Sequence, residues 1–172
     1  MAKVFTKYDY QAGDLLQAGI DHLGAADFLL KENPSFFDSA GYLAHMGLEL
    51  ILKSWLLYEK GQFEGIHPLQ DLAKEILDHD CRVSFSKREM QTLTFLSKFE
   101  KLRYPNRKNP IEIGAEDIEQ IDELADAIWQ QLPDGLIKSF ENLEKLKKGG
   151  RVLMVRPSNI PRNLKFETGI EE

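Results

Sequence analysis

The sequence is poor in several features that define large classes of proteins. Its 172 residues include a single cysteine, Cys81, which excludes an internal disulfide framework and favours a reducing compartment. No apolar run approaches the length of a membrane span. The segment from Met1 to Tyr10 has lysines but no apolar stretch after them, so we expect no signal peptide. These absences predict a soluble, cytoplasmic protein that does not enter a membrane.

Basic and acidic residues occupy different segments, and the net charge is −6. A segment without lysine or arginine carries eight acids: Glu112, Glu116, Asp117, Glu119, Asp122, Glu123, Asp126 and Asp134. Two clusters are mainly basic: Lys98, Lys101, Arg103, Arg107 and Lys108, and Lys145, Lys147, Lys148, Arg151, Arg156, Arg162 and Lys165. The net charge argues against a general nucleic-acid coat. We interpret the acids as solvated helix faces and the basic clusters as candidate anion or phosphate sites.

Apolar residues recur every three or four positions through most of the chain, which is the helical period. Five segments follow this pattern: 11–31, 36–60, 68–78, 86–102 and a long one that opens near Ala115. The second segment is apolar on so much of its surface that we expect it in the middle of the protein. The pattern predicts an all-α fold, an antiparallel up-and-down bundle of about five helices.

Helix boundaries are marked by capping residues, glycine and proline. Ser35 or Asp38 is a candidate cap for the second helix, which Gly61 is expected to end. Residues 86–89 have the spacing of a capping box at the start of the fourth helix. Pro133 is expected to kink or end the fifth helix before the pattern resumes as far as Leu146.

The end of the chain differs from the helical part. We expect residues 1–148 to form the bundle and residues 149–172 to form a short, extended C-terminal arm. The run 151–156 has the composition of a short strand, but we find no other good strand to pair with it. The arm is expected to lie on the bundle or on a second subunit.

Three polar residues form a stripe on the central helix. His45, Glu49 and Lys53 are spaced four residues apart, so they share one face. Charged groups on such an apolar helix need partners, because an unpaired buried charge is costly. One interpretation is a satisfied ion-pair network in which Arg103 or Arg107 reaches Glu49. The other is a polar seam that lines a cleft or a dimer interface, with Glu49 and Lys53 as ligand-binding residues.

The four histidines are not spaced as metal ligands, so we expect no metal. The sequence also lacks a glycine-rich phosphate loop, so we expect no cofactor. His45 and Glu49 can still converge with His67 through folding. His67 directly precedes Pro68, a position that favours a role in a turn or in helix capping.

Three motifs in order resemble a known family. They are the run 40–57 followed by Gly61, the segment His67-Pro-Leu-Gln-Asp-Leu72, and Leu102-Arg-Tyr-Pro105. Their order and spacing resemble the higher-eukaryote and prokaryote nucleotide-binding (HEPN) domain over about residues 11–146. The resemblance implies a bundle of four or five helices that is commonly dimeric.

The same resemblance bears on activity. Many HEPN proteins are metal-independent endoribonucleases that carry arginine, four to six residues, then histidine at a dimer cleft. Here Arg103 is followed by Tyr-Pro-Asn-Arg-Lys-Asn-Pro, and no histidine occurs after His79, so the motif is absent. An arginine beside a proline-stiffened loop suits a phosphate or carboxylate but is a poor general base.

Three functional hypotheses follow. The first is a dimeric, non-catalytic HEPN-like protein that binds a nucleotide or RNA near Arg103, Tyr104 and Arg107. The second is a toxin-like endoribonuclease whose base is His45 or His67, with Arg103 stabilising transition-state charge. The third is an interaction subunit of a toxin–antitoxin module, paired with a nucleotidyltransferase through its acidic segment.

Overall fold

The computed structural model describes residues 3–103, 111–146, 153–154 and 165–166. At positions 34, 103, 141–146 and in the last two segments it describes the backbone alone. The described part contains six α-helices: α1 (Ala12–Glu32), α2 (Phe37–Lys60), α3 (Leu69–His79), α4 (Lys87–Leu96), α5 (Ala115–Gln131) and α6 (Asp134–Leu146). It also contains two 3-10 helices, η1 (Pro34–Phe36) and η2 (Ser97–Arg103). The prediction of an all-α antiparallel bundle is confirmed.

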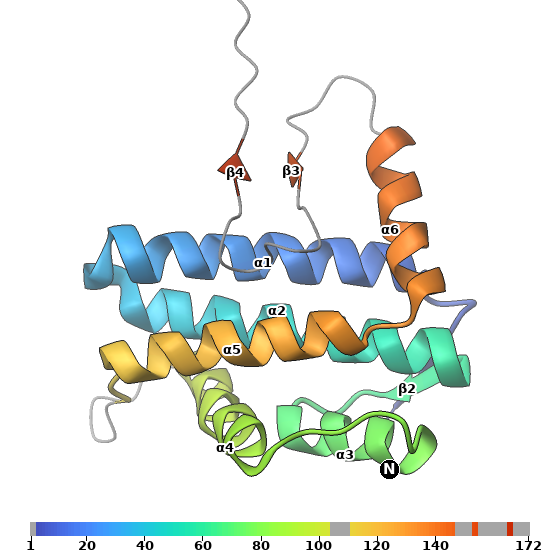
Figure 1. Ribbon diagram of the computed structural model, residues 1–172, viewed down its shortest axis with the longest axis horizontal. Helices are drawn as coiled ribbons and strands as arrows, with labels where there is room; N and C mark the ends of the chain where they lie inside the picture. The colour runs from blue at the N-terminus through green and yellow to red at the C-terminus, as the bar shows by residue number, and fades with distance from the viewer. Residues whose placement is uncertain (1–2, 104–110, 147–152, 155–164, 167–172) are drawn as a thin grey trace, which may run out of the picture.

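Helices α1 and α2 lie side by side and antiparallel along the length of the molecule (Figure 1). Their backbones approach closely where Gly19 faces Gly47. A Cβ atom added at Gly47 would lie 2.8 Å from the carbonyl oxygen of Gly19. Small residues at this crossing let the two longest helices pack against each other without side chains between them.

Helix α2 lies in the middle of the fold, as its apolar composition predicts. It contacts α1, α3, α4 and η2, and Leu48, Leu52, Trp55 and Leu56 are all buried to 1% exposure or less. The remaining helices cover this pair: α4 packs on α5, and α6 packs on α1. A polar residue on α2 is therefore enclosed unless a neighbouring element leaves an opening.

Several boundaries agree with the sequence prediction. Glu89 N donates to Ser86 Oγ, and Ser86 N donates to Glu89 Oε2, which together form the expected capping box of α4. Gly61 ends α2 in the left-handed conformation, with φ of 74°. Pro133 separates α5 from α6 and so ends the helix rather than kinking it.

Two boundary predictions are wrong. Neither Ser35 nor Asp38 caps α2; its N-cap is Phe36, which has no capping side chain, because the 3-10 turn η1 runs directly into the helix. The fourth helix does not stay α-helical to residue 102. It ends at Leu96 and continues as η2, where the Ser97 hydroxyl donates to the carbonyl oxygen of Leu93 and so offers a local alternative to the regular helix.

Short strands add to the bundle. Strand β1 (Val4–Thr6) pairs antiparallel with β2 (Gln62–Glu64), and β3 (Leu153–Met154) pairs antiparallel with β4 (Lys165–Phe166). The prediction that the strand in 151–156 lacks a partner is therefore wrong. Ladders of two or three residues are too short for side-chain alternation to mark them in a sequence. The division at residue 148 stays a prediction.

No helix in the described residues combines the length and the apolar composition needed to cross a membrane.

Candidate functional site

The polar stripe of α2 is buried at the centre of the molecule. His45, Glu49 and Lys53 lie on successive turns of the helix and expose 0%, 4% and 6% of their surface. They are surrounded by the apolar core of the bundle. Since buried charges are stable only when paired, the contacts of Glu49 decide what this cluster can do.

The Glu49 carboxylate contacts three basic side chains. Its Oε1 accepts a hydrogen bond from Lys53 Nζ at 2.6 Å and lies 3.0 Å from His67 Nδ1. Its Oε2 lies 3.2 Å from His45 Nε2. That last pair is close but poorly aligned, because neither ring nitrogen of His45 makes a hydrogen bond with a described residue. We call these four side chains the Glu49 cluster.

The cluster keeps Glu49 ionised. Burial raises the pKa of its carboxyl group, but the contacts with His45, Lys53 and His67 and the positive charge of Lys53 outweigh burial and lower the pKa to about 2. The Lys53 ammonium balances the carboxylate charge directly.

His67 is the member of the Glu49 cluster that reaches the surface. It lies in the segment between β2 and α3, and 45% of its side chain is exposed. Because Nδ1 faces Glu49, the ring is oriented by a carboxylate, and Nε2 has no partner among the described residues. His45 and Glu49 do converge with His67, which the sequence left open. His67 is not a helix cap: the N-cap of α3 is Pro68, and no side chain caps it.

Two residues that the sequence did not single out support the Glu49 cluster. Lys53 Nζ lies 5.6 Å from the ring centroid of Phe63, so the aromatic face supplies a further favourable contact for the ammonium. Ser97 Oγ accepts a hydrogen bond from Leu69 N at 2.9 Å, which fixes the start of α3 against η2. Neither contact has a sequence signal, because each joins positions far apart in the chain.

We call the segment 102–105 the arginine corner; its Arg103 is the last residue of η2. Phe99 is fully buried and packs over Gly41 of α2, where a Cβ atom would come within 2.2 Å of the ring. This packing fixes η2, whose backbone ends at Arg103. Tyr104 and Arg107 lie outside the described residues, as does any contact of the two arginines with Glu49.

Metal-ligating side chains are not clustered in the described part of the chain. No group of three or more histidine, cysteine, aspartate or glutamate side chains in the described ranges is arranged to hold a metal ion.

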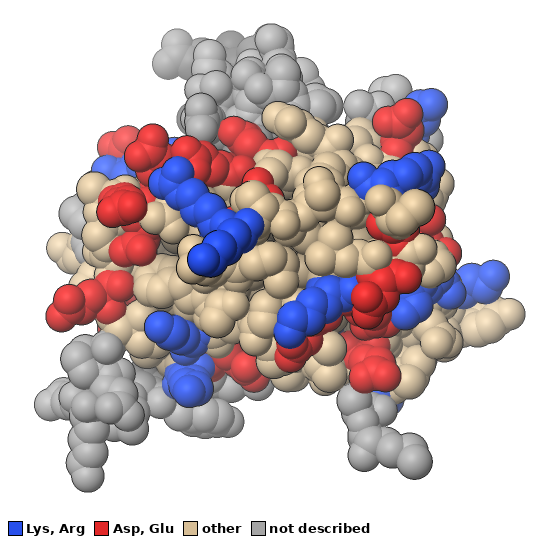
Figure 2. Space-filling model, turned by 60° about the horizontal axis from the view of Figure 1, so that its bottom comes forward, with Lys and Arg blue, Asp and Glu red and all other residues tan. Residues whose placement is uncertain are grey.

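Part of the acidic segment is already paired within the chain. Asp117 Oδ2 accepts from Gly114 N at 2.7 Å, Asp122 lies 3.1 Å from Lys31, and Glu123 lies 3.3 Å from Arg88. Figure 2 shows basic and acidic side chains interleaved over the face of the molecule that it presents. Any anion site on that face is therefore local.

The comparison with family models gives one match. The model described as "HEPN domain" matches residues 12–146, which include all six helices. Searches among curated proteins and among solved structures find no match to the chain. The helical bundle, its central polar helix and the family model agree, and the chain therefore belongs to the HEPN domain family.

Proposed function

We propose that this HEPN domain binds a phosphate-bearing ligand, a nucleotide or RNA, on the surface between His67 and Arg103, and that it does not cleave RNA by the family's usual chemistry. The observation that carries the proposal is the contact of buried Glu49 with His67, which holds a half-exposed imidazole in one orientation. An oriented, surface-reaching side chain on a buried charge network is typical of a binding site.

The fold supports a shared site for His67 and the arginine corner. His67 lies two residues before Leu69, whose amide is bonded to Ser97 at the start of η2. A 3-10 helix rises about 2 Å per residue, so the backbones of His67 and Arg103 lie about 25 Å apart at most. A short oligonucleotide can span that distance. The site would also include Tyr104 and Arg107. Glu49 and Lys53 would contribute from the buried side, because Glu49 orients His67 and Lys53 balances the charge of Glu49.

The sequence around Arg103 supports binding without cleavage. The family's ribonucleases need a histidine a few residues after this arginine, and none follows it here. Arginine supplies a planar pair of donors for phosphate oxygens but stays protonated, so it cannot accept a proton.

Isothermal titration of the intact protein against nucleotides and short RNAs tests the proposal. We expect saturable binding that is weakened at least tenfold by Arg103→Ala combined with Arg107→Ala. Arg82→Ala is a matched control, because Arg82 is exposed and paired with Asp80. Absence of binding, or binding that the double variant leaves unchanged, contradicts the proposal.

A second candidate function rests on the 3.0 Å contact between Glu49 Oε1 and His67 Nδ1. In this alternative, His67 Nε2 accepts the proton of an RNA 2′-hydroxyl, and the 2′-oxygen attacks the adjacent phosphorus. The bond to the 5′-oxygen of the next nucleotide breaks, and that oxygen leaves as a hydroxyl after taking a proton from water. His45 is the weaker candidate base, since it is fully buried and out of reach of a ligand at the surface.

Cleavage of a labelled RNA distinguishes the two functions. If His67 is a base, His67→Ala abolishes cleavage in a folded protein, while His79→Ala, a change on α3, leaves it intact. Intact RNA after incubation with the wild-type chain rules out this second candidate for that substrate.

We further propose a homodimer as the assembly. Phe28, Phe36 and Phe37 flank the α1–α2 connection and expose 54%, 52% and 37% of their surface. Large exposed apolar side chains gathered at one end of a domain favour an interface with another chain. A nucleotidyltransferase partner is the alternative, but the pairing of Asp117, Asp122 and Glu123 within the chain makes the acidic segment less available to it.

A further inference from the structure

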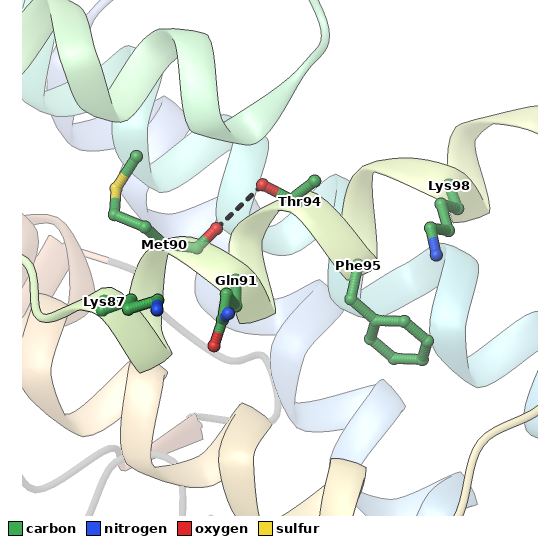
Figure 3. Close-up of a pocket in the computed structure, with 6 residues that line it drawn as sticks. All are labelled: Lys87, Met90, Gln91, Thr94, Phe95 and Lys98. Carbon is green, nitrogen blue, oxygen red and sulfur yellow. Dashed lines mark hydrogen bonds between the residues drawn. The ribbon is translucent and has the colours of Figure 1, made fainter.

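The outward face of α4 forms a shallow groove of about 310 Å³. Its lining comes from α4 and the start of η2: Lys87, Met90, Gln91, Thr94, Phe95 and Lys98 (Figure 3). The spacing of three or four residues puts these side chains along one side of the helix. We call this surface the α4 groove.

The α4 groove is basic at both ends. Lys87 and Lys98 are about 17 Å apart along the helix axis, given the rise of α and 3-10 helices. Neither lysine forms an ion pair with a described residue, and no acid lines the groove. Lys101 is also exposed and extends the same charge along η2 toward Arg103. In a chain of net charge −6, this arrangement attracts anions to one place.

Phe95 lies between the two lysines and is firmly anchored. Its ring meets the buried ring of Phe99 edge to face, with centroids 5.5 Å apart and planes at 81°. Lys98 Nζ lies over one face of the Phe95 ring, 5.7 Å from its centroid, so a base would stack on the other face or displace this flexible side chain. A half-buried aromatic ring beside a cation is the arrangement on which nucleobases stack in single-strand binding proteins.

The remaining polar groups of the α4 groove suit a base edge. The side chain of Gln91 makes no hydrogen bond with a described residue, so its amide can both donate and accept. The Thr94 hydroxyl donates to the carbonyl oxygen of Met90 at 2.9 Å, which leaves its oxygen free to accept. Figure 3 shows Gln91 and Phe95 pointing the same way from α4, between the two lysines.

We propose that the α4 groove binds single-stranded RNA, with phosphates on Lys87 and Lys98 and a base stacked on Phe95. The inference rests on the proposed function, because it takes RNA as the ligand and adds a second contact region beyond His67 and Arg103. An acidic protein would satisfy the lysines equally well. An acidic protein would not use the Phe95 ring or the Gln91 amide, whereas a nucleobase can contact both. Single-stranded RNA is therefore the better occupant.

Fluorescence anisotropy with a short labelled oligouridylate tests the α4 groove. Phe95→Leu keeps an apolar side chain against Phe99 but removes the stacking face, and we expect about tenfold weaker binding. Lys87→Gln with Lys98→Gln should reduce the slope of log affinity against log salt by about 0.7 for each lysine. Tyr8→Leu and Lys138→Gln are matched controls at exposed positions outside the groove and should bind as the wild type does.

The outcomes separate this proposal from the proposed function. If the wild type binds and the groove variants bind equally well, the α4 groove proposal is wrong and the proposed function stands. If neither the wild type nor any variant binds RNA or nucleotide, both fail. Light scattering on the groove variants covers the remaining possibility: loss of a dimer would make the groove an interface between copies and overturn the RNA proposal. Thermal unfolding confirms that each variant is folded.

Discussion

At the scale of single residues, the molecule is organised around one buried carboxylate. Glu49 is enclosed by apolar side chains, yet its carboxylate contacts two histidines and a lysine. Its negative charge therefore has basic partners inside the core. A buried network of this kind adds little net stability but is very sensitive to the loss of one member. Its value lies in fixing His67, which no other described contact orients.

The pH dependence of stability tests the state of Glu49. Its pKa is about 2 in the folded chain and 4.5 when unperturbed, so the unfolded chain takes up the proton first as the pH falls. Ionised rather than protonated Glu49 therefore stabilises the folded chain by about 3 kcal/mol, an effect that is complete above about pH 5 and is lost as the pH falls from 4.5 toward 2. Urea unfolding across this range measures it.

Glu49→Gln should remove this part of the pH dependence. At neutral pH the variant should be less stable by about 3–5 kcal/mol, because the buried Lys53 ammonium loses its counter-charge. Glu119→Gln, an exposed change on α5, is the matched control and should change stability by less than about 0.5 kcal/mol. Equal pH profiles for Glu49→Gln and the wild type would show that folding does not shift the pKa of Glu49.

The sequence predicts this site only in part. The four-residue spacing puts His45, Glu49 and Lys53 on one face, because helix geometry is local. The approach of His67, 18 residues from Glu49 in the chain, depends on how α3 docks, and a single sequence does not fix it. The structure describes the backbone of Arg103 alone, so its role stays a prediction.

At the scale of elements, the α1–α2 pair determines the rest of the packing. The two helices approach through Gly19 and Gly47, and the other helices are arranged around them. Glycine lowers helix propensity by about 1 kcal/mol relative to alanine, so its presence inside both helices has a packing reason.

Gly47→Ala should destabilise the protein although it favours the helix. The added Cβ atom would lie 2.8 Å from both Gly19 O and Leu23 Cγ, so the helices must move apart. We expect a net loss of about 2 kcal/mol in the free energy of unfolding, measured in urea. Gly114→Ala meets only Asp117 Oδ2, at 3.5 Å, and should cost less, about 0.5–1 kcal/mol, because alanine is a poorer N-cap than glycine. A Gly47→Ala variant as stable as the wild type would contradict the close approach.

Helices were predictable because their apolar period is local and repeated over several turns. The change from α4 to η2 was not predictable. It depends on the hydrogen bond from the Ser97 hydroxyl to the Leu93 carbonyl oxygen and on the packing of Phe99 against Gly41. The β1–β2 pair joins residues nearly 60 positions apart through three residues on each side, which leaves no recognisable pattern.

Across the whole molecule, the net charge of −6 conceals a separation of acidic and basic side chains into different regions. Acids of α5 pair with cations of α1 and α4, whereas the lysines of the α4 groove remain without ion pairs among the described residues. The net charge of −6 therefore permits RNA binding, but only where basic side chains gather locally.

The proposed dimer makes a prediction at the same scale. Light scattering should give twice the chain mass for the wild type, and Phe28→Ser with Phe36→Ser should shift the population to monomers. Exposed apolar side chains contribute about 25 cal/mol per Å² when an interface buries them, so two lost phenylalanines per chain weaken association strongly. Tyr8→Ser, at a side chain 91% exposed, is the control. A monomeric wild type contradicts the dimer.

We expect this HEPN domain to bind RNA without cleaving it. The most direct measurement follows one sample of labelled single-stranded RNA with increasing protein, by anisotropy for binding and then by denaturing electrophoresis for cleavage. We predict saturable binding that weakens with salt, with the RNA recovered intact. Failure to bind RNA, or cleavage that is lost in His67→Ala, would contradict the claim.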